Sequence, residues 1–111
     1  MKTKKKFLLK KIKKNPKFSI ITVVKNDQHN ISKTIKSIYT QSYKDFEYLI
    51  IDGKSTDETL TKILKFKNKI NILISENDKG IYYAMNKAIK LTKDKIIIFV
   101  NSGDLLTKNA L

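Results

Sequence analysis

The feature that most constrains this chain is residues 48–59, where a strand pattern changes abruptly into a polar turn and a helix start. Residues 48–51 (YLII) are apolar and rich in β-branched side chains, and they end at Asp52. Ser55 and Glu58 follow at the spacing of a capping box, in which each side chain satisfies a free backbone N–H at the helix start. The pattern therefore predicts a buried strand that delivers a carboxylate to its C-terminal tip.

The same alternation of strand and helix patterns recurs along most of the chain. Nearly continuous apolar runs predict strands at residues 18–24, 46–51, 70–74 and 95–100. Apolar residues at helical spacing predict three intervening helices, marked by Ile31, Ile35 and Ile38, then Leu60, Ile63 and Leu64, then Ile81, Met85, Ala88 and Ile89. This βαβαβαβ order predicts an α/β fold with a parallel, Rossmann-like sheet and helices on both faces.

Polar clusters follow each of the four predicted strands. They comprise Asn26 with Asp27, residues 52–57, residues 76–79 and residues 101–104. Because the carboxyl ends of parallel strands meet at one edge of a sheet, these clusters predict a ligand crevice there.

The crevice would offer carboxylates, amides and a lysine, and the sequence has neither a P-loop nor a G-x-G-x-x-G motif. Asp52 could accept the N3–H of a uracil, because an ionised carboxylate is an acceptor only. Asp104 could hold Mg²⁺ or Mn²⁺, hard ions that bind through one or two carboxylates and substrate phosphates. Lys79 could add a positive charge beside the same phosphates.

Each of these residues also has a purely structural interpretation. Aspartates at strand ends commonly form turns or cap helices, and capping alone accounts for residues 55–57. We interpret His29 as a loop or cap residue, because the chain has no second histidine and no cysteine to pair with it.

The net charge of +14 is concentrated at the N-terminus. All 24 basic residues are lysines and nine lie within residues 1–17, whereas the remaining 94 residues have a net charge of +5. Arginine is the usual residue for bidentate contacts to phosphates and bases, so its absence argues against a nucleic-acid partner. The lack of cysteine and of a long apolar run gives no sign of an oxidising compartment or a bilayer span, and we expect a cytoplasmic protein.

Residues 1–17 are expected to be a basic tail with two interpretations. As a helix, the tail would place Phe7, Leu8 and Ile12 on one face among lysines, which suits peripheral contact with anionic lipid at the inner face of a membrane. As a solvated, frayed segment it would have no such role, and four apolar residues are a thin anchor. Pro16 closes the tail, and the domain is expected over residues 18–111.

Five blocks of the sequence, in this order, resemble family 2 glycosyltransferases, which have the GT-A fold. They are residues 18–26, the helix end from Ser37 to Gln41, IIDGKSTDET, SENDKGIYYAMNKAI and IIIFVNSGD. The resemblance covers residues 18–111 and implies the nucleotide-sugar-binding half of such a domain, with a donor that is often UDP-linked. The implied reaction is transfer of the sugar, with inversion, to the hydroxyl of a sugar or lipid-linked acceptor in bacterial-type polysaccharide or glycan synthesis.

The resemblance also implies roles for individual residues. Those implied to bind the nucleotide-sugar are Asn26, Asp52, Asp78, Lys79 and Asn86. Asp104 occupies the last position of the motif that binds a divalent cation, Mg²⁺ or Mn²⁺.

Four positions depart from the pattern of the family, among them Tyr83, which replaces a common acidic residue. Gly53 and Gly103 stand where many members have a further aspartate, and Lys54 stands where glycine is common. The acidic general base is expected beyond the C-terminus, because the chain stops seven residues after Asp104. We therefore expect the donor-binding half of a truncated enzyme, with two alternatives: a non-catalytic nucleotide-binding fragment, or an anionic-surface binder that uses its lysine-rich tail.

Overall fold

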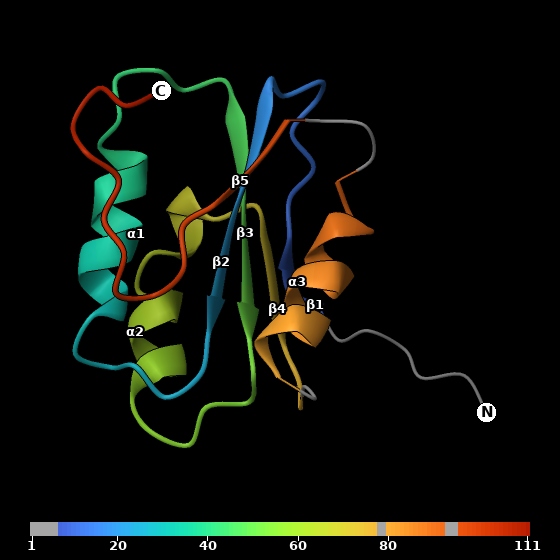
Figure 1. Ribbon diagram of the computed structural model, residues 1–111, viewed down its shortest axis with the longest axis vertical. Helices are drawn as coiled ribbons and strands as arrows, with labels where there is room; N and C mark the ends of the chain where they lie inside the picture. The colour runs from blue at the N-terminus through green and yellow to red at the C-terminus, as the bar shows by residue number, and fades with distance from the viewer. Residues whose placement is uncertain (1–6, 78–79, 93–95) are drawn as a thin grey trace.

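The computed structural model describes residues 7–77, 80–92 and 96–111, which form one five-stranded sheet with helices on both faces (Figure 1). The strand order is β1-β4-β3-β2-β5. The strands are β1 (Phe7–Lys10), β2 (Phe18–Val24), β3 (Phe46–Asp52), β4 (Ile72–Ser75) and β5 (Ile96–Phe99). The helices are α1 (Ile31–Tyr39), α2 (Thr59–Leu64), the 3₁₀-helix η1 (Lys67–Lys69) and α3 (Ile81–Ile89).

The four strands predicted from apolar runs all form and lie parallel to one another. β2 and β3 pair over their whole lengths, from Phe18 opposite Phe46 to Val24 opposite Asp52, while β4 extends β3 and β5 extends β2 on the other side. α1 and α2 cover one face of the sheet and α3 covers the other (Figure 1). The predicted α/β class with a parallel, Rossmann-like sheet is confirmed.

The N-terminal tail differs from both of its interpretations. Phe7–Lys10 form strand β1, which pairs antiparallel with β4 at the edge of the sheet, so the helix and the frayed tail are wrong for these residues. Burial alternates along β1, with Phe7 and Leu9 half-buried and Leu8 exposed. Pairing with β4 and burial of Phe7 and Leu9 favour this period of two over the helical period.

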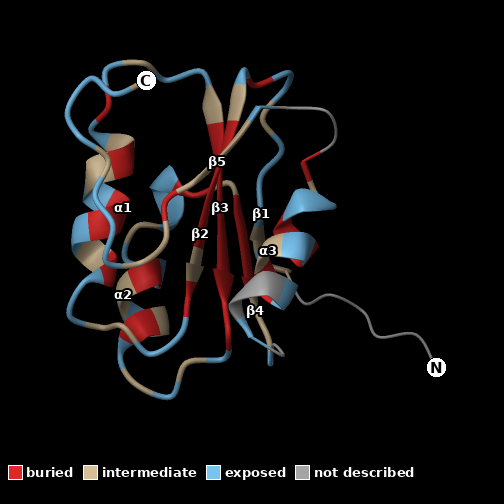
Figure 2. Ribbon diagram, viewed as in Figure 1, coloured by how far each residue is buried: buried red, intermediate tan, exposed pale blue. Residues whose placement is uncertain are grey.

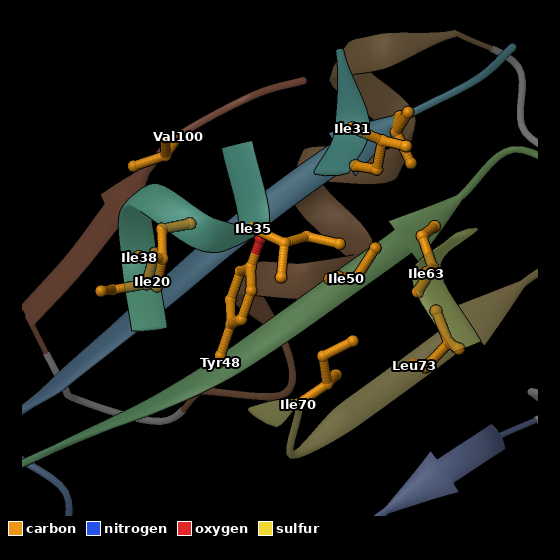
Figure 3. Packing of buried hydrophobic residues seen from close by; sticks show 11 residues of the cluster. Ile20, Ile31, Ile35, Ile38, Tyr48, Ile50, Ile63, Ile70, Leu73 and Val100 are labelled. Atoms are coloured by element: carbon orange, nitrogen blue, oxygen red, sulfur yellow. The ribbon is translucent and has the colours of Figure 1, made fainter. Parts of the chain in front are cut away.

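The larger core lies between the sheet and the helices α1 and α2. Its buried members are Ile20, Val24, Ile31, Ile35, Ile38, Tyr48, Ile50, Ile63, Ile70, Leu73 and Val100. β2 and β3 are buried along most of their lengths (Figure 2), and Figure 3 shows Tyr48 standing among the isoleucines of the sheet and of α1. A smaller core, which includes Leu49, Ile51 and Ala88, lies beneath α3.

The helix α3 buries only part of the face that its apolar residues predict. Ala84 and Ala88 are buried, whereas Ile89 is 42% exposed and Met85 is half-buried. Small alanines allow α3 to approach the sheet closely, so its buried stripe is narrower than the apolar residues alone predict. In the part of the chain that the structure describes, no helix has the length and apolar character needed to cross a membrane.

Candidate functional site

The loops that follow β2 and β3 are joined by Asn26. Its backbone is left-handed, with φ of 49°, a conformation that asparagine tolerates better than most residues. Its N–H donates to the Ser55 hydroxyl at 2.8 Å, and its side-chain oxygen accepts from the N–H groups of Thr56 and Asp57 at 2.7 and 3.3 Å. The side chain of Asn26 thus holds together the loops at the carboxyl ends of β2 and β3, where the crevice is predicted.

Asp52 lies at the tip of β3, as predicted, but its carboxylate is fully buried. Its Oδ1 accepts from the Ser55 hydroxyl at 2.5 Å, and its Oδ2 accepts from the Ser55 N–H at 3.0 Å and the Ser75 hydroxyl at 2.7 Å. Asp52 therefore fixes the loop after β3 to the end of β4. Hydrogen bonds to an ionised acceptor are stronger than neutral ones, so this link is a firm one.

The predicted capping box is not formed. The Ser55 hydroxyl donates to Asp52, and α2 begins only at Thr59, whose N–H donates to Asp57 Oδ1 at 2.9 Å. The Ser55 oxygen, which would accept from an N–H of the helix start in a capping box, instead accepts from the Asn26 N–H at 2.8 Å. Hydrogen bonds from Thr59, its hydroxyl foremost, and from the Gln28 N–H hold the pKa of the Asp57 carboxyl below its ordinary value.

The turn after β5 carries the predicted metal ligand. The Asp104 side chain is exposed, and no described residue forms a hydrogen bond with its carboxylate. The side-chain oxygen of Asn101, which also follows β5, accepts from the Val23 N–H at 3.3 Å. Sequence reasoning did not single out Asp27, whose Oδ2 accepts from the Ser102 hydroxyl at 2.8 Å and so fastens this turn to the loop after β2.

The residues at this turn fit a hard divalent cation in one way only. Within residues 7–77, 80–92 and 96–111, no three His, Cys, Asp or Glu side chains gather into a cluster that could hold a metal ion. A single exposed carboxylate is nevertheless what Mg²⁺ commonly uses in proteins, with phosphate oxygens and water completing its octahedral shell. Asp104 would therefore hold a cation together with a ligand.

Two departures from the family pattern have a backbone explanation. Gly103 has φ of 97°, a conformation that side chains rarely adopt, so an aspartate there would be strained. Lys54 has φ of 58°, which is the left-handed conformation that glycine adopts without cost.

The remaining predicted residues belong to β4 and α3. Asp78 and Lys79 lie outside the described residues. Asn86 is exposed on α3, whereas its neighbour Lys87 is only 8% exposed and forms an ion pair with Glu76, which follows β4. Sequence reasoning missed Lys87, although its position three residues after Ala84 places it on the buried face of the helix.

The chain has recognisable relatives among known proteins. The sequence profile of glycosyl transferase family 2 matches residues 19–111. The chain is 37% identical over 94 residues to the UDP-Glc:alpha-D-GlcNAc-diphosphoundecaprenol beta-1,3-glucosyltransferase WfgD of Escherichia coli. It is 32% identical over 100 residues to the poly(ribitol-phosphate) beta-N-acetylglucosaminyltransferase TarS of Staphylococcus aureus.

These matches include most of the chain and a small part of each relative. They cover 84% and 86% of the chain but only 37% of WfgD and 18% of TarS. The chain therefore spans well under half the length of these relatives.

Solved structures of glycosyltransferases resemble the fold of this chain. The crystal structure of residues 1–349 of S. aureus TarS in complex with UDP-GlcNAc superposes with a TM-score of 0.67 at 31% identity, covering 77% of this chain and 26% of that one. A mannosyltransferase from Pyrobaculum calidifontis, in complex with GDP-Man and Mn²⁺, superposes with a TM-score of 0.68 over 88% of this chain and 31% of its own. At 22% identity, this second likeness shows the shared fold alone.

Proposed function

Because the chain belongs to glycosyl transferase family 2, we propose that it supplies the donor-binding part of an enzyme that transfers a sugar from a UDP-linked donor to an acceptor hydroxyl in bacterial glycan synthesis. The observation that supports the proposal is the group of polar residues at the carboxyl ends of the strands. There a hydrogen-bonded loop framework around Asn26 and Asp52 adjoins a turn whose Asp104 carboxylate is exposed. The names of the relatives, which include UDP-glucose and N-acetylglucosamine transferases, support a UDP-linked donor.

The framework around Asp52 is proposed to receive the base of the nucleotide. The described donors occupy three of the roughly four acceptor positions of an ionised carboxylate, which leaves one on Oδ1 for the N3–H of a uracil. Asn26 shapes the same loop, and Asp78, Lys79 and Asn86 are proposed to line the phosphate and sugar side. A base that reaches Asp52 must displace atoms that now cover it, because the carboxylate has no exposed surface.

Asp104 is proposed to hold a divalent cation, Mg²⁺ or Mn²⁺, together with the donor diphosphate. A bound cation would neutralise the negative charge that develops on the leaving diphosphate. This chain would supply one carboxylate at the carboxyl ends of the strands. The other coordination positions of the cation would be filled by the ligand and water.

The acceptor site and the general base are proposed to come from sequence outside these 111 residues. The chain spans 37% of the length of WfgD, and the acceptor is proposed to be a sugar or a lipid-linked saccharide. Donor binding is therefore the activity to test in this chain by itself.

The test is a calorimetric titration of UDP into the purified chain with and without Mn²⁺. We expect Mn²⁺-dependent binding that Asp104→Asn weakens at least about tenfold, because the cation loses its charged protein ligand. Asp45→Asn is the matched control, since Asp45 is also exposed but precedes β3 at the opposite edge of the sheet. A folded chain that binds no UDP, with or without Mn²⁺, would contradict the proposal.

A second proposal is that the connection between β1 and β2 contacts anionic lipid. Ile12 is 84% exposed and lies in a run with Lys10, Lys11, Lys13 and Lys14, a combination that suits insertion among anionic headgroups. We expect co-sedimentation with vesicles that contain phosphatidylglycerol, and loss of it in Ile12→Ser. Ile96→Ser, at a 57% exposed position on β5, should sediment like the wild type, and equal loss in both variants would contradict a specific role for Ile12.

A further inference from the structure

After β5 the chain does not leave the domain but runs back along α1 to the C-terminus (Figure 1). Three polar residues spaced three and four apart, Thr34, Ser37 and Gln41, bind this returning segment, and we call them the α1 polar row. Ser37 and Gln41 are part of the helix-end block that contributed to the family resemblance without an assigned role. The structure gives that block a physical purpose.

Thr34 holds the backbone on both sides of the proposed cation ligand. Its buried hydroxyl accepts from the Gly103 N–H at 3.1 Å and donates to the Asp104 carbonyl at 2.9 Å. The Asp104 N–H donates to the Asn101 carbonyl at 2.9 Å. The backbone of Asp104 is therefore held at its N–H and its carbonyl, while the carboxylate remains exposed.

The other two members of the α1 polar row secure the segment farther along. Ser37 Oγ accepts from the Leu106 N–H at 3.1 Å, and its own hydrogen goes to the Thr34 carbonyl at 2.7 Å. The Gln41 amide donates to the Thr107 carbonyl at 2.8 Å and accepts from the Ala110 N–H at 3.0 Å. Leu106 packs against the larger core, so both polar and apolar contacts fix the segment to the domain.

We propose that Thr34 is the positioning residue for Asp104, supported by Ser37 and Gln41. The inference rests on the proposed function, because the position of the Asp104 carboxylate matters only if it meets a cation there. An aspartate on a loose turn would have to be ordered when the ligand binds, and that ordering would cost conformational entropy. Because the hydrogen bonds to Thr34 form when the protein folds, this entropy is lost on folding and not on binding. The carboxylate is therefore in position before the cation binds.

The test compares Thr34→Val with Thr34→Ser and Thr40→Val. Valine keeps the shape of Thr34 but loses both hydrogen bonds, whereas serine keeps the hydroxyl. Thr40 is a matched control, because its hydroxyl is exposed and donates to the Lys36 carbonyl, away from the returning segment. The readouts are the Mn²⁺-dependent affinity for UDP and the exchange rates of the Gly103 and Leu106 amide hydrogens.

We expect Thr34→Val to weaken Mn²⁺-dependent UDP binding about tenfold and to speed exchange at Gly103, since two hydrogen bonds are lost. Thr34→Ser and Thr40→Val should match the wild type in both readouts. Slow amide exchange in β2 and β3 would show that each variant is folded.

Two contrary results can be told apart. If the wild type binds Mn²⁺ and UDP, and Thr34→Val binds them equally well despite fast exchange at Gly103, the positioning role is wrong and the proposed function stands. If the folded wild type binds neither, the proposed function is wrong, and the positioning role is wrong with it.

Discussion

Two regions at the carboxyl ends of the strands differ in how their acidic groups are used. In the loop after β3, the Asp52 carboxylate is buried and accepts three hydrogen bonds from Ser55 and Ser75. In the turn after β5, the backbone is held just as firmly, by Thr34 and Asp27, but the Asp104 carboxylate is exposed.

The same residue type therefore has different surroundings at the ends of β3 and β5, the two strands that flank β2. The Asp52 carboxylate forms its hydrogen bonds within the protein and fixes the shape of a loop. In the proposed function, the exposed Asp104 carboxylate is available to a ligand, and the protein fixes only the position of its backbone. An exposed, fixed carboxylate pays little desolvation cost in the free protein and little ordering cost on binding.

The largest expected effect separates the two aspartates by stability. Asp52→Asn should lower the free energy of unfolding by about 2–3 kcal/mol, because charge-assisted bonds from Ser55 and Ser75 are lost and an amide N–H₂ faces their donors. Asp104→Asn should change it by less than about 0.5 kcal/mol, as is usual for exposed positions. Urea denaturation of both variants measures the free energy of unfolding. Equal losses in the two variants would contradict the different roles of Asp52 and Asp104.

The turn after β5 should reject the aspartate that many family members carry at position 103. Gly103→Asp is expected to lower the free energy of unfolding by about 1–2 kcal/mol, because its φ of 97° is strained for any side chain. The Asp27 carboxylate adds repulsion, since its Oδ2 lies 3.8 Å from where the new Cβ would stand. Thermal unfolding beside Gly103→Asn, which has nearly the same shape without the charge, separates strain from repulsion. A variant as stable as the wild type would show that the turn is not constrained as described.

A buried hydrogen-bonded chain links β3 through Thr22 to the end of β5, and alkaline pH should lower the stability that it contributes. The Tyr48 hydroxyl lies 2.7 Å from Thr22 Oγ1, which in turn donates to the Val100 carbonyl at 2.6 Å, so Tyr48 is the donor of the pair. Burial raises the pKa of Tyr48 well above its ordinary value. The unfolded chain therefore loses this proton first, and stability that is fully present below pH 10 falls by about 1.4 kcal/mol per unit above it.

Urea denaturation at pH 9, 10 and 11 measures this loss. Tyr48→Phe should unfold with about 1 kcal/mol less free energy at pH 8, because one buried hydrogen bond is gone, and should have a much shallower alkaline decline. A decline of the same slope in both proteins would assign the effect to other groups.

The smallest expected effect is a gain in the loop after β3. Lys54→Gly should raise the free energy of unfolding by about 0.5–1 kcal/mol, because the left-handed backbone at φ of 58° strains lysine and suits glycine. Lys65→Gly is the control, since Lys65 has an ordinary right-handed helical backbone after α2 and should lose stability. A loss in Lys54→Gly would mean that the lysine side chain stabilises the loop by contacts that outweigh the strain.

The sheet was predictable because its central strands β2 and β3 are buried on both faces, and an apolar run such as residues 18–24 leaves few alternatives. The three helices were predictable because apolar residues recur at helical spacing between the strands. β1 was missed because two half-buried residues give no clear period, and only pairing with β4 decides their conformation. The capping box failed at Ser55 because its oxygen accepts from the Asn26 N–H, and α2 begins only at Thr59.

The positions of the candidate site residues at the strand ends were predictable, but their contacts were not. Strand ends placed Asn26, Asp52 and Asp104 at one edge, as topology requires. Burial could not be read from sequence, so the inward turn of Asp52 and the ion pair of Lys87 with Glu76 required three-dimensional contacts. The contact of Gln41 with the returning segment could not be predicted either, because Thr107 and Ala110 lie more than sixty residues farther along the chain.

The most direct test of this account is amide NMR of the chain with UDP, first alone and then with Mn²⁺. Paramagnetic Mn²⁺ broadens the signals of nearby nuclei, so it reports where the cation sits. We predict shifts in residues 26 and 53–57 with UDP, and Mn²⁺ broadening centred on Gly103 and Asp104. The signals of Lys17 and Lys44, which precede β2 and β3 at the opposite edge, should stay sharp. Broadening centred on Lys17 and Lys44, or none at Asp104 when UDP is bound, would contradict the account.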